Sequence, residues 1–79
     1  MSKLNKILSG VLNIPEEKIT DDTSPDNTES WDSFNSLMLV SELERNYSIS
    51  FTIGEVTGIR SVADIKKCLK IHGVDEYNI

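Results

Sequence analysis

The stretch WDSFNSLMLVSELERN, residues 31–46, decides the fold class. From Ser33 to Asn46 it predicts a helix that is apolar over far more than a narrow stripe, and such a helix is either central in a core or shows an apolar patch to a partner. At helical spacing a core position is the commoner role for Met38, Leu39 and Val40. Apolar surface left uncovered on this helix would instead be a docking site.

Two further helices complete the predicted core. The first spans residues 3–12, where apolar residues follow the i, i+3, i+4, i+7, i+8 spacing of one helical face. The last spans residues 62–72 and begins with Ser61 and Asp64 in the spacing of a capping box. Residues 47–53 alternate apolar and polar positions but have no second strand to pair with, so we expect an extended segment. The sequence therefore predicts an all-α bundle of three to four helices.

A long connection separates the first two of these helices. Residues 15–32 contain both prolines and several Asp and Thr residues, with one short helical turn possible after Pro15. We expect Ile14, Ile19 and Trp31 to anchor the connection to the core. A structureless connection of more than about 12–15 residues is uncommon in a compact domain and is often functional. A second, short helical piece is expected at residues 55–57, and the tail after Gly73 is expected to fray.

Size, charge and composition exclude several classes of protein. With 79 residues, the chain has room for a single domain over residues 1–79, with an ordered core at about 3–73. Its net charge is −5, and residues 16–44 carry nine acidic residues against one lysine, which opposes nucleic-acid binding. A single Cys68 and a single His72 make a metal site improbable. Polar residues interrupt the apolar N-terminal segment, so we expect a cytoplasmic protein without membrane insertion. We also expect a monomer.

Ser33 carries the clearest chemical signal in the chain. It stands at the predicted start of the second helix, where unpaired backbone N–H groups and the helix dipole favour an anion such as a phosphodiester. The alternative is that Asp32 or Ser33 simply caps the helix, which is common for these residue types. A third possibility is a very small hydrolase with Ser33 as nucleophile. That possibility lacks a nearby base, because His72 lies near the end of the last helix among lysines.

The segment around Ser33 resembles the signature and second helix of acyl carrier proteins. The likeness includes Asp32-Ser33-Phe34 and, beyond it, Leu37, Leu39-Val40 and Leu43-Glu44. It extends to Ile14-Pro15, the acidic residues 20–24, Glu29-Ser30-Trp31 and residues 60–65, and so covers nearly the whole chain.

This resemblance implies a covalent 4'-phosphopantetheine on Ser33, transferred from coenzyme A by a phosphopantetheinyl transferase, with Asp32 supporting the metal ion used in that transfer. It also implies that the chain is no enzyme. Its arm would carry an acyl or aminoacyl thioester from a loading ligase to a downstream transferase or synthase.

Four positions on the second helix are candidates for contact with partner enzymes: Phe34, Asn35, Met38 and Glu42. Phe34 replaces the usual Leu of the signature, and Asn35 and Met38 stand where carriers of fatty acid synthesis commonly have acids. Arg45 lowers the negative charge further. We therefore expect a specialised biosynthetic pathway, such as polyketide, peptide-like or cell-envelope synthesis, with partners that read apolar contacts more than charge. The alternative function is an unmodified interaction module that docks through the same helix.

Overall fold

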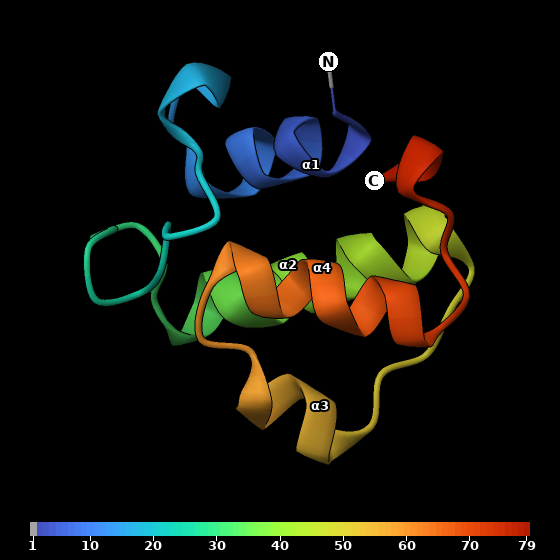
Figure 1. The fold of residues 1–79 in the computed structure, drawn as a ribbon. Helices are drawn as coiled ribbons and strands as arrows, with labels where there is room; N and C mark the ends of the chain where they lie inside the picture. Colours follow the sequence, from blue (N-terminus) through green and yellow to red (C-terminus); the bar gives the residue numbers. More distant parts are fainter. Residues whose placement is uncertain (1) are drawn as a thin grey trace.

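The computed structural model describes residues 2–79, and this part of the chain is folded into helices and their connections (Figure 1). The four α-helices are α1 (Lys3–Leu12), α2 (Ser33–Tyr47), α3 (Ile53–Gly58) and α4 (Val62–Ile71). Single 3-10 turns occur at Glu16–Lys18 and Glu76–Asn78. The predicted all-α bundle is confirmed, and the predicted bounds of α1 hold at both ends.

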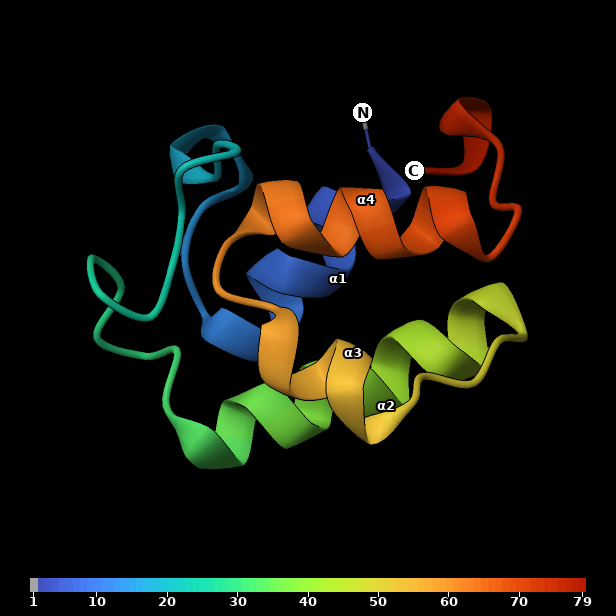
Figure 2. The same ribbon diagram turned by 60° about the horizontal axis from the view of Figure 1, so that its bottom comes forward.

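The core lies where α1, α2 and α4 meet. Each of these helices turns one apolar face inward, and the fully covered side chains are Leu4, Leu8, Leu12, Leu39, Leu43, Val62, Ile65 and Leu69. α1 and α2 run antiparallel, since the Lys3 ammonium at the start of α1 donates to the Asn46 carbonyl near the end of α2 at 2.9 Å. α4 lies alongside this pair and runs in roughly the same direction as α2, and α3 lies at the edge of the bundle (Figures 1 and 2).

The long connection between α1 and α2 is anchored by two of the side chains expected to hold it. Ile19 and Trp31 are buried in the core, while Ile14 packs against the core but stays half-buried. The connection also caps α4, because the carbonyls of Asp21 and Thr23 accept hydrogen bonds from the first backbone N–H groups of that helix at 3.1 and 2.9 Å. These groups have no partner inside a helix, so the connection stabilises the start of α4.

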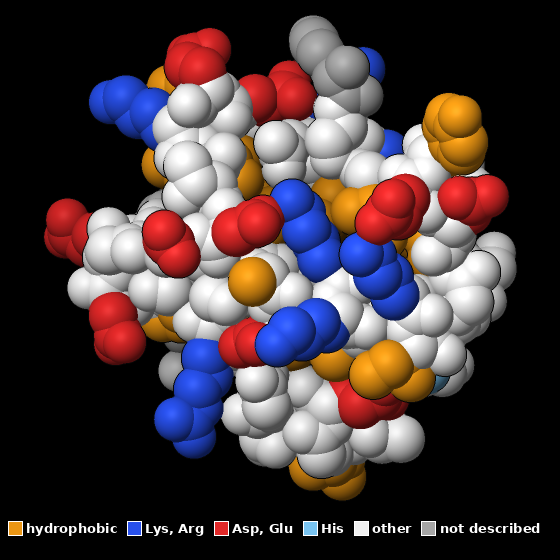
Figure 3. Space-filling model, viewed as in Figure 1, with side chains coloured by type: hydrophobic (Ala, Val, Ile, Leu, Met, Phe, Trp, Pro, Cys, Tyr) orange, Lys and Arg blue, Asp and Glu red, His pale blue; other side chains and the backbone are white. Residues whose placement is uncertain are grey.

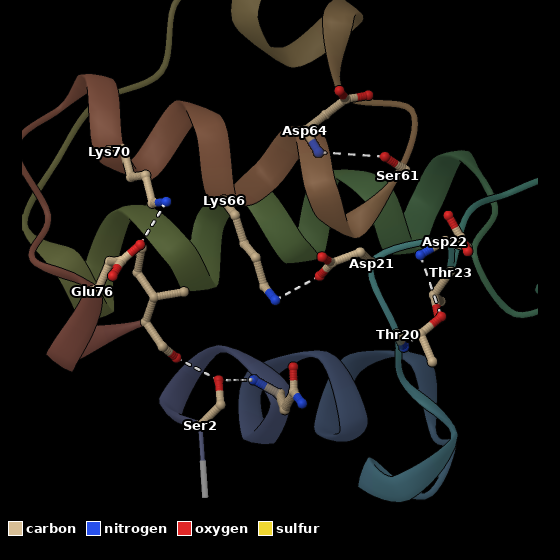
Figure 4. Close-up of polar contacts among 12 residues, drawn as sticks. Ser2, Thr20, Asp21, Asp22, Thr23, Ser61, Asp64, Lys66, Lys70 and Glu76 are labelled. Carbon is tan, nitrogen blue, oxygen red and sulfur yellow. Dashed lines mark hydrogen bonds and ion pairs between the residues drawn. The ribbon is translucent and has the colours of Figure 1, made fainter.

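Ion pairs join segments that are distant in sequence. The Lys66 ammonium lies 2.6 Å from the Asp21 carboxylate, which ties α4 to the acidic connection, and Lys70 lies 2.7 Å from Glu76 (Figure 4). Figure 3 shows lysine and acidic side chains interleaved over this face of the molecule. The excess negative charge of the connection is therefore partly balanced by α4. Over residues 2–79, no helix is long and apolar enough to cross a bilayer.

The C-terminal tail differs from its expectation, because it is packed and not frayed. Gly73 adopts a left-handed conformation with φ of 85°, as expected for the residue that ends α4. The Val74 N–H then donates to the Leu69 carbonyl at 2.9 Å, and the Leu4 N–H donates to the Ile79 carbonyl at 3.0 Å. Val74 and Ile79 also pack against the core. The tail thus closes over the start of α1.

α3 is longer than the predicted three-residue piece and is held mainly by polar contacts. None of its residues is buried. Thr52 and Glu55 form a reciprocal capping box at its first turn. The second Glu55 carboxylate oxygen lies 2.8 Å from Nε2 of His72, and the His72 ring packs edge-on against Phe51 at 5.5 Å between centroids. Glu55 therefore links α3 to the end of α4.

We expect the acid stability of the fold to depend on Glu55. The hydrogen bond from the Thr52 N–H, aided by His72, holds the pKa of Glu55 below its ordinary value of 4.5. A carboxyl whose pKa is lower in the folded state contributes stability when it is ionised, and that stability is lost as the pH falls below about 4.5. Between about pH 6 and pH 3, the wild-type melting temperature should fall more steeply than that of Glu55→Gln. Parallel curves for these two proteins, with Glu17→Gln as control, would contradict this linkage.

Candidate functional site

Ser33 is the first residue of α2 and its side chain is exposed. Asp32 precedes it as the N-cap, and its Oδ1 accepts a hydrogen bond from the Asn35 N–H at 2.8 Å. Within residues 2–79 the Ser33 hydroxyl makes no hydrogen bond. The local structure therefore leaves capping to Asp32 and leaves the Ser33 oxygen available to a reagent in solution.

The electrostatic environment of Ser33 is more mixed than the sequence indicated. Asp32 occupies the third backbone N–H of α2, which leaves the N–H groups of Ser33 and Phe34 without a hydrogen-bond acceptor among the described residues. These groups and the helix dipole attract an anion. The adjacent Asp32 carboxylate repels one. The Asp32 carboxylate thus cancels part of the positive potential that would otherwise stabilise a phosphodiester on Ser33.

The segment that carries Ser33 is held in place from both sides. Asn35 Nδ2 donates to the Ser30 carbonyl at 2.7 Å, and Trp31 Nε1 donates to Ser36 Oγ at 3.0 Å. Trp31 is only 4% exposed, so the indole fixes the end of the connection against the core. Its role as a structural anchor is confirmed. Ser33 is therefore presented from a constrained turn.

The neighbouring serines are poorer candidates than Ser33 for a reaction with a bulky donor. Ser30 Oγ is buried and has no hydrogen-bond partner. Ser36 is half-buried and its hydroxyl accepts the Trp31 indole N–H. Within residues 30–36, Ser33 alone combines an exposed side chain with a free hydroxyl.

An apolar surface adjoins Ser33 on α2. Phe34 is 69% exposed, Leu37 is 64% exposed and Met38 is 44% exposed. Leu39 is buried as expected, and Val40 is half-buried. The prediction that Met38 occupies a core position is wrong. Met38 is exposed because α2 is rotated about its axis so that Leu39 and Leu43 face the core, which leaves the face with Met38 in solvent.

The other candidate contact residues have partners of their own. Glu42 accepts from Arg45 one turn along α2, with 2.8 Å between Arg45 Nη2 and Glu42 Oε1. Asn35 is half-buried and bonded to the connection. Of the four positions, Phe34 and Met38 thus offer the most free surface. The pairing of Glu42 also makes the exposed face of α2 less negative.

The two reactive side chains outside this segment have different surroundings. Burial raises the pKa of the half-buried Cys68 thiol, so its nucleophilic thiolate form is disfavoured. His72 is engaged by Glu55, and no hydrogen bond among the described residues links it to Ser33. The structure therefore brings neither group to the start of α2.

Similarity to a known family agrees with this geometry. The family described as "Phosphopantetheine attachment site" matches residues 2–69, which include all four α-helices up to Leu69 in α4. The all-helical fold is that of a small carrier domain, and the chain belongs to this family. The family is defined by covalent attachment of 4'-phosphopantetheine. No curated protein shows a significant match to the chain.

Proposed function

We propose that Ser33 is the attachment residue and that residues 1–79 act as a single carrier domain for acyl or aminoacyl thioesters. The observation that supports this most directly is the free, exposed Ser33 hydroxyl between two serines that are buried or hydrogen-bonded. When bound, the phosphopantetheine arm supplies a terminal thiol that forms a thioester with the cargo. The chain itself holds and presents the cargo, and we propose that it catalyses no reaction.

The surroundings of Ser33 fit such an arm. The hydroxyl faces solvent, so a phosphodiester formed there needs no rearrangement of the core. Phe34 and Leu37 offer exposed apolar surface beside it. The free N–H groups of Ser33 and Phe34 can donate to the phosphate oxygens. Ser33 Oγ would attack the pantetheine-linked phosphorus of coenzyme A, which forms the phosphodiester, breaks the pyrophosphate bond and releases adenosine 3',5'-bisphosphate. The serine proton must leave to an external base, because no side chain of residues 2–79 is hydrogen-bonded to this hydroxyl.

The partners that we propose follow from the family of the chain and from the exposed surface of α2. A phosphopantetheinyl transferase is needed to attach the arm, and biosynthetic enzymes are needed to load and use it. We infer a loading ligase and a downstream transferase or synthase of a specialised pathway that contact Phe34, Asn35, Met38 and Glu42. The exposed Phe34 and Met38 and the paired Glu42 support partners that recognise apolar contacts.

A second candidate function is an unmodified interaction module. The exposed Phe34, Leu37 and Met38 favour it, because they would dock a protein whether or not Ser33 carries an arm. The two functions differ in a measurable property, which is the mass of the protein after exposure to coenzyme A and a transferase.

We expect the wild-type protein to gain the mass of one phosphopantetheine when it is incubated with coenzyme A, Mg²⁺ and a broad-specificity transferase. Asp32→Ser should keep the N-cap hydrogen bond to Asn35 but lose the carboxylate, and it should gain this mass much more slowly. Asp32→Ala should also lose about 0.5–2 kcal/mol of folding stability, because the cap is gone. Intact-mass spectrometry over time and thermal melts measure the two effects separately.

The comparison of these variants isolates the role that we propose for Asp32. Equal rates for wild type and Asp32→Ser would show that the carboxylate is only a cap. A slow Asp32→Ala with a fast Asp32→Ser would lead to the same conclusion. An unchanged mass in the wild-type protein itself would instead favour the unmodified interaction module.

A further inference from the structure

A groove between α1 and α2 lies beside the face that carries Ser33. Its volume is about 410 Å³. α1 contributes Lys6, Ile7, Gly10 and Val11, and α2 contributes Asn35, Met38 and Glu42. Three of the four positions that the sequence marked for partner contact therefore line one groove. Its other wall is α1, which the sequence did not connect with binding.

The groove has an apolar lining, and exposed Gly10 leaves open space on its α1 wall, which we call the notch. Ile7 and Val11 are half-buried and Met38 is partly exposed. A Cβ atom added at Gly10 would meet no atom within 4 Å, so no neighbour inside the fold requires the missing side chain. Glycine inside a helix costs about 1 kcal/mol relative to alanine. No described residue of the domain fills the space above Gly10, so a side chain of a partner protein can occupy it.

The charges around the groove are positive, in contrast to the acidic chain as a whole. Lys6 on its α1 rim is exposed and makes no ion pair among residues 2–79. Lys3 lies about one turn earlier on the same helix, where it reaches the carbonyl of Asn46. Glu42, the acid on the α2 rim, is neutralised by Arg45. The end of the groove near Lys6 and Lys3 therefore favours an acidic partner.

We propose that the α1–α2 groove binds an acidic amphipathic helix of a partner protein. One apolar side chain of that helix fills the notch over Gly10 and contacts Met38, and its carboxylates face Lys6 and Lys3. Two antiparallel helices accept a third helix between them, as in other helix-in-groove complexes. α1 has ten residues and is thus about 15 Å long, so the partner helix contributes about three turns. Binding does not depend on modification of Ser33.

The test uses a synthetic helical peptide of about three turns. It has leucines at i, i+3, i+4 and i+7 and glutamates elsewhere. Titrated into ¹⁵N-labelled protein, it should shift amide signals of residues 6–11 and 35–42 most strongly. Gly10→Leu fills the notch and should weaken binding by about tenfold or more. Gly58→Leu is the matched control, since a Cβ there also meets no atom within 4 Å, and it should bind as wild type does.

Charge variants test the second part of the proposal. Lys6→Glu should weaken binding of the acidic peptide. A peptide with lysines in place of the glutamates should bind the wild-type protein less tightly than the acidic peptide does. Ser33→Ala should bind the acidic peptide unchanged, which separates this groove from the carrier function. Gly10→Leu should melt no lower than wild type, because leucine is the better helix former.

Several results would overturn the proposal. These are absence of binding at millimolar peptide, equal affinity of the acidic and basic peptides, and wild-type affinity in Gly10→Leu. Signal shifts centred on Phe34, Leu37 and Ile53 would place the docking surface outside the groove, toward α3. If Gly10→Leu fails to fold, unchanged binding in Lys6→Glu still refutes the charge argument.

Discussion

Ser33→Ala should abolish uptake of phosphopantetheine and leave the fold intact. The hydroxyl is exposed and makes no hydrogen bond among the described residues, so its removal costs little stability. The cap on α2 belongs to Asp32 and survives the change. Intact-mass spectrometry after incubation with coenzyme A and a transferase should show no added mass, and the melting temperature should match that of wild type.

Two neighbouring serines provide matched controls for this variant. Ser30→Ala should still take up one arm, since the Ser30 hydroxyl is buried. Ser36→Ala should also take up one arm but lose about 0.5–1.5 kcal/mol of stability, because the Trp31 indole loses its acceptor. Retained modification in Ser33→Ala, or loss of modification in either control without loss of folding, would contradict the assignment of the site.

Leu43→Ala should cause the largest loss of stability among the substitutions considered. Leu43 lies on the inner face of α2 with 0% of its surface exposed, in the core cluster to which α1 and α4 also contribute. Truncation of a buried leucine removes transfer energy and leaves a cavity, which together cost about 2–5 kcal/mol. A domain of this size has a thin core. We therefore expect a large shift of the denaturant midpoint in urea unfolding.

Leu37→Ala is the appropriate control, because Leu37 lies on the same helix but is 64% exposed. Its free energy of unfolding should change by no more than about 0.5 kcal/mol. Similar destabilisation by the two substitutions would mean that α2 is not oriented as the structure shows. In that case the apolar surface beside Ser33 would belong to the core.

The three longer helices could be predicted because their signals are local. Apolar spacing marks α1, and Gly73 marks the stop of α4. Ser61, which accepts from the Asp64 N–H at 3.3 Å, marks its start. α2 was predicted one residue too short, at Asn46 instead of Tyr47. Such patterns need only residues that are close in sequence, so they can be recognised without knowledge of the tertiary structure.

The features that sequence reasoning missed depend on distant contacts or on a weak local signal. The tail is ordered by a bond between Leu4 and Ile79, which no local pattern indicates. α3 is too short to show a helical period, although Thr52 and Glu55 have the spacing of a capping box. The contact of Glu55 with His72 again joins residues far apart in the chain.

For the candidate site, the sequence predicted the position of Ser33 at the start of α2 but not the surroundings of its side chain. The motif pointed to Ser33, and helix position alone explains why its side chain is exposed. Whether Met38 faces the core depends on the rotation of α2, which packing against α1 and α4 sets. The hydrogen bond from Trp31 to Ser36 likewise follows from the way in which the connection enters α2. These features follow from three-dimensional packing.

Location of the added mass within the chain tests the central claim most directly. Trypsin should release residues 19–45 as one peptide, since no lysine or arginine lies between Lys18 and Arg45. After incubation with coenzyme A and a transferase, fragmentation of this peptide should place one phosphopantetheine on Ser33. The fragment that ends at Asp32 and the fragment that begins at Phe34 should both lack the added mass. The same mass on another residue of the peptide, or an unmodified peptide under these conditions, would contradict the account.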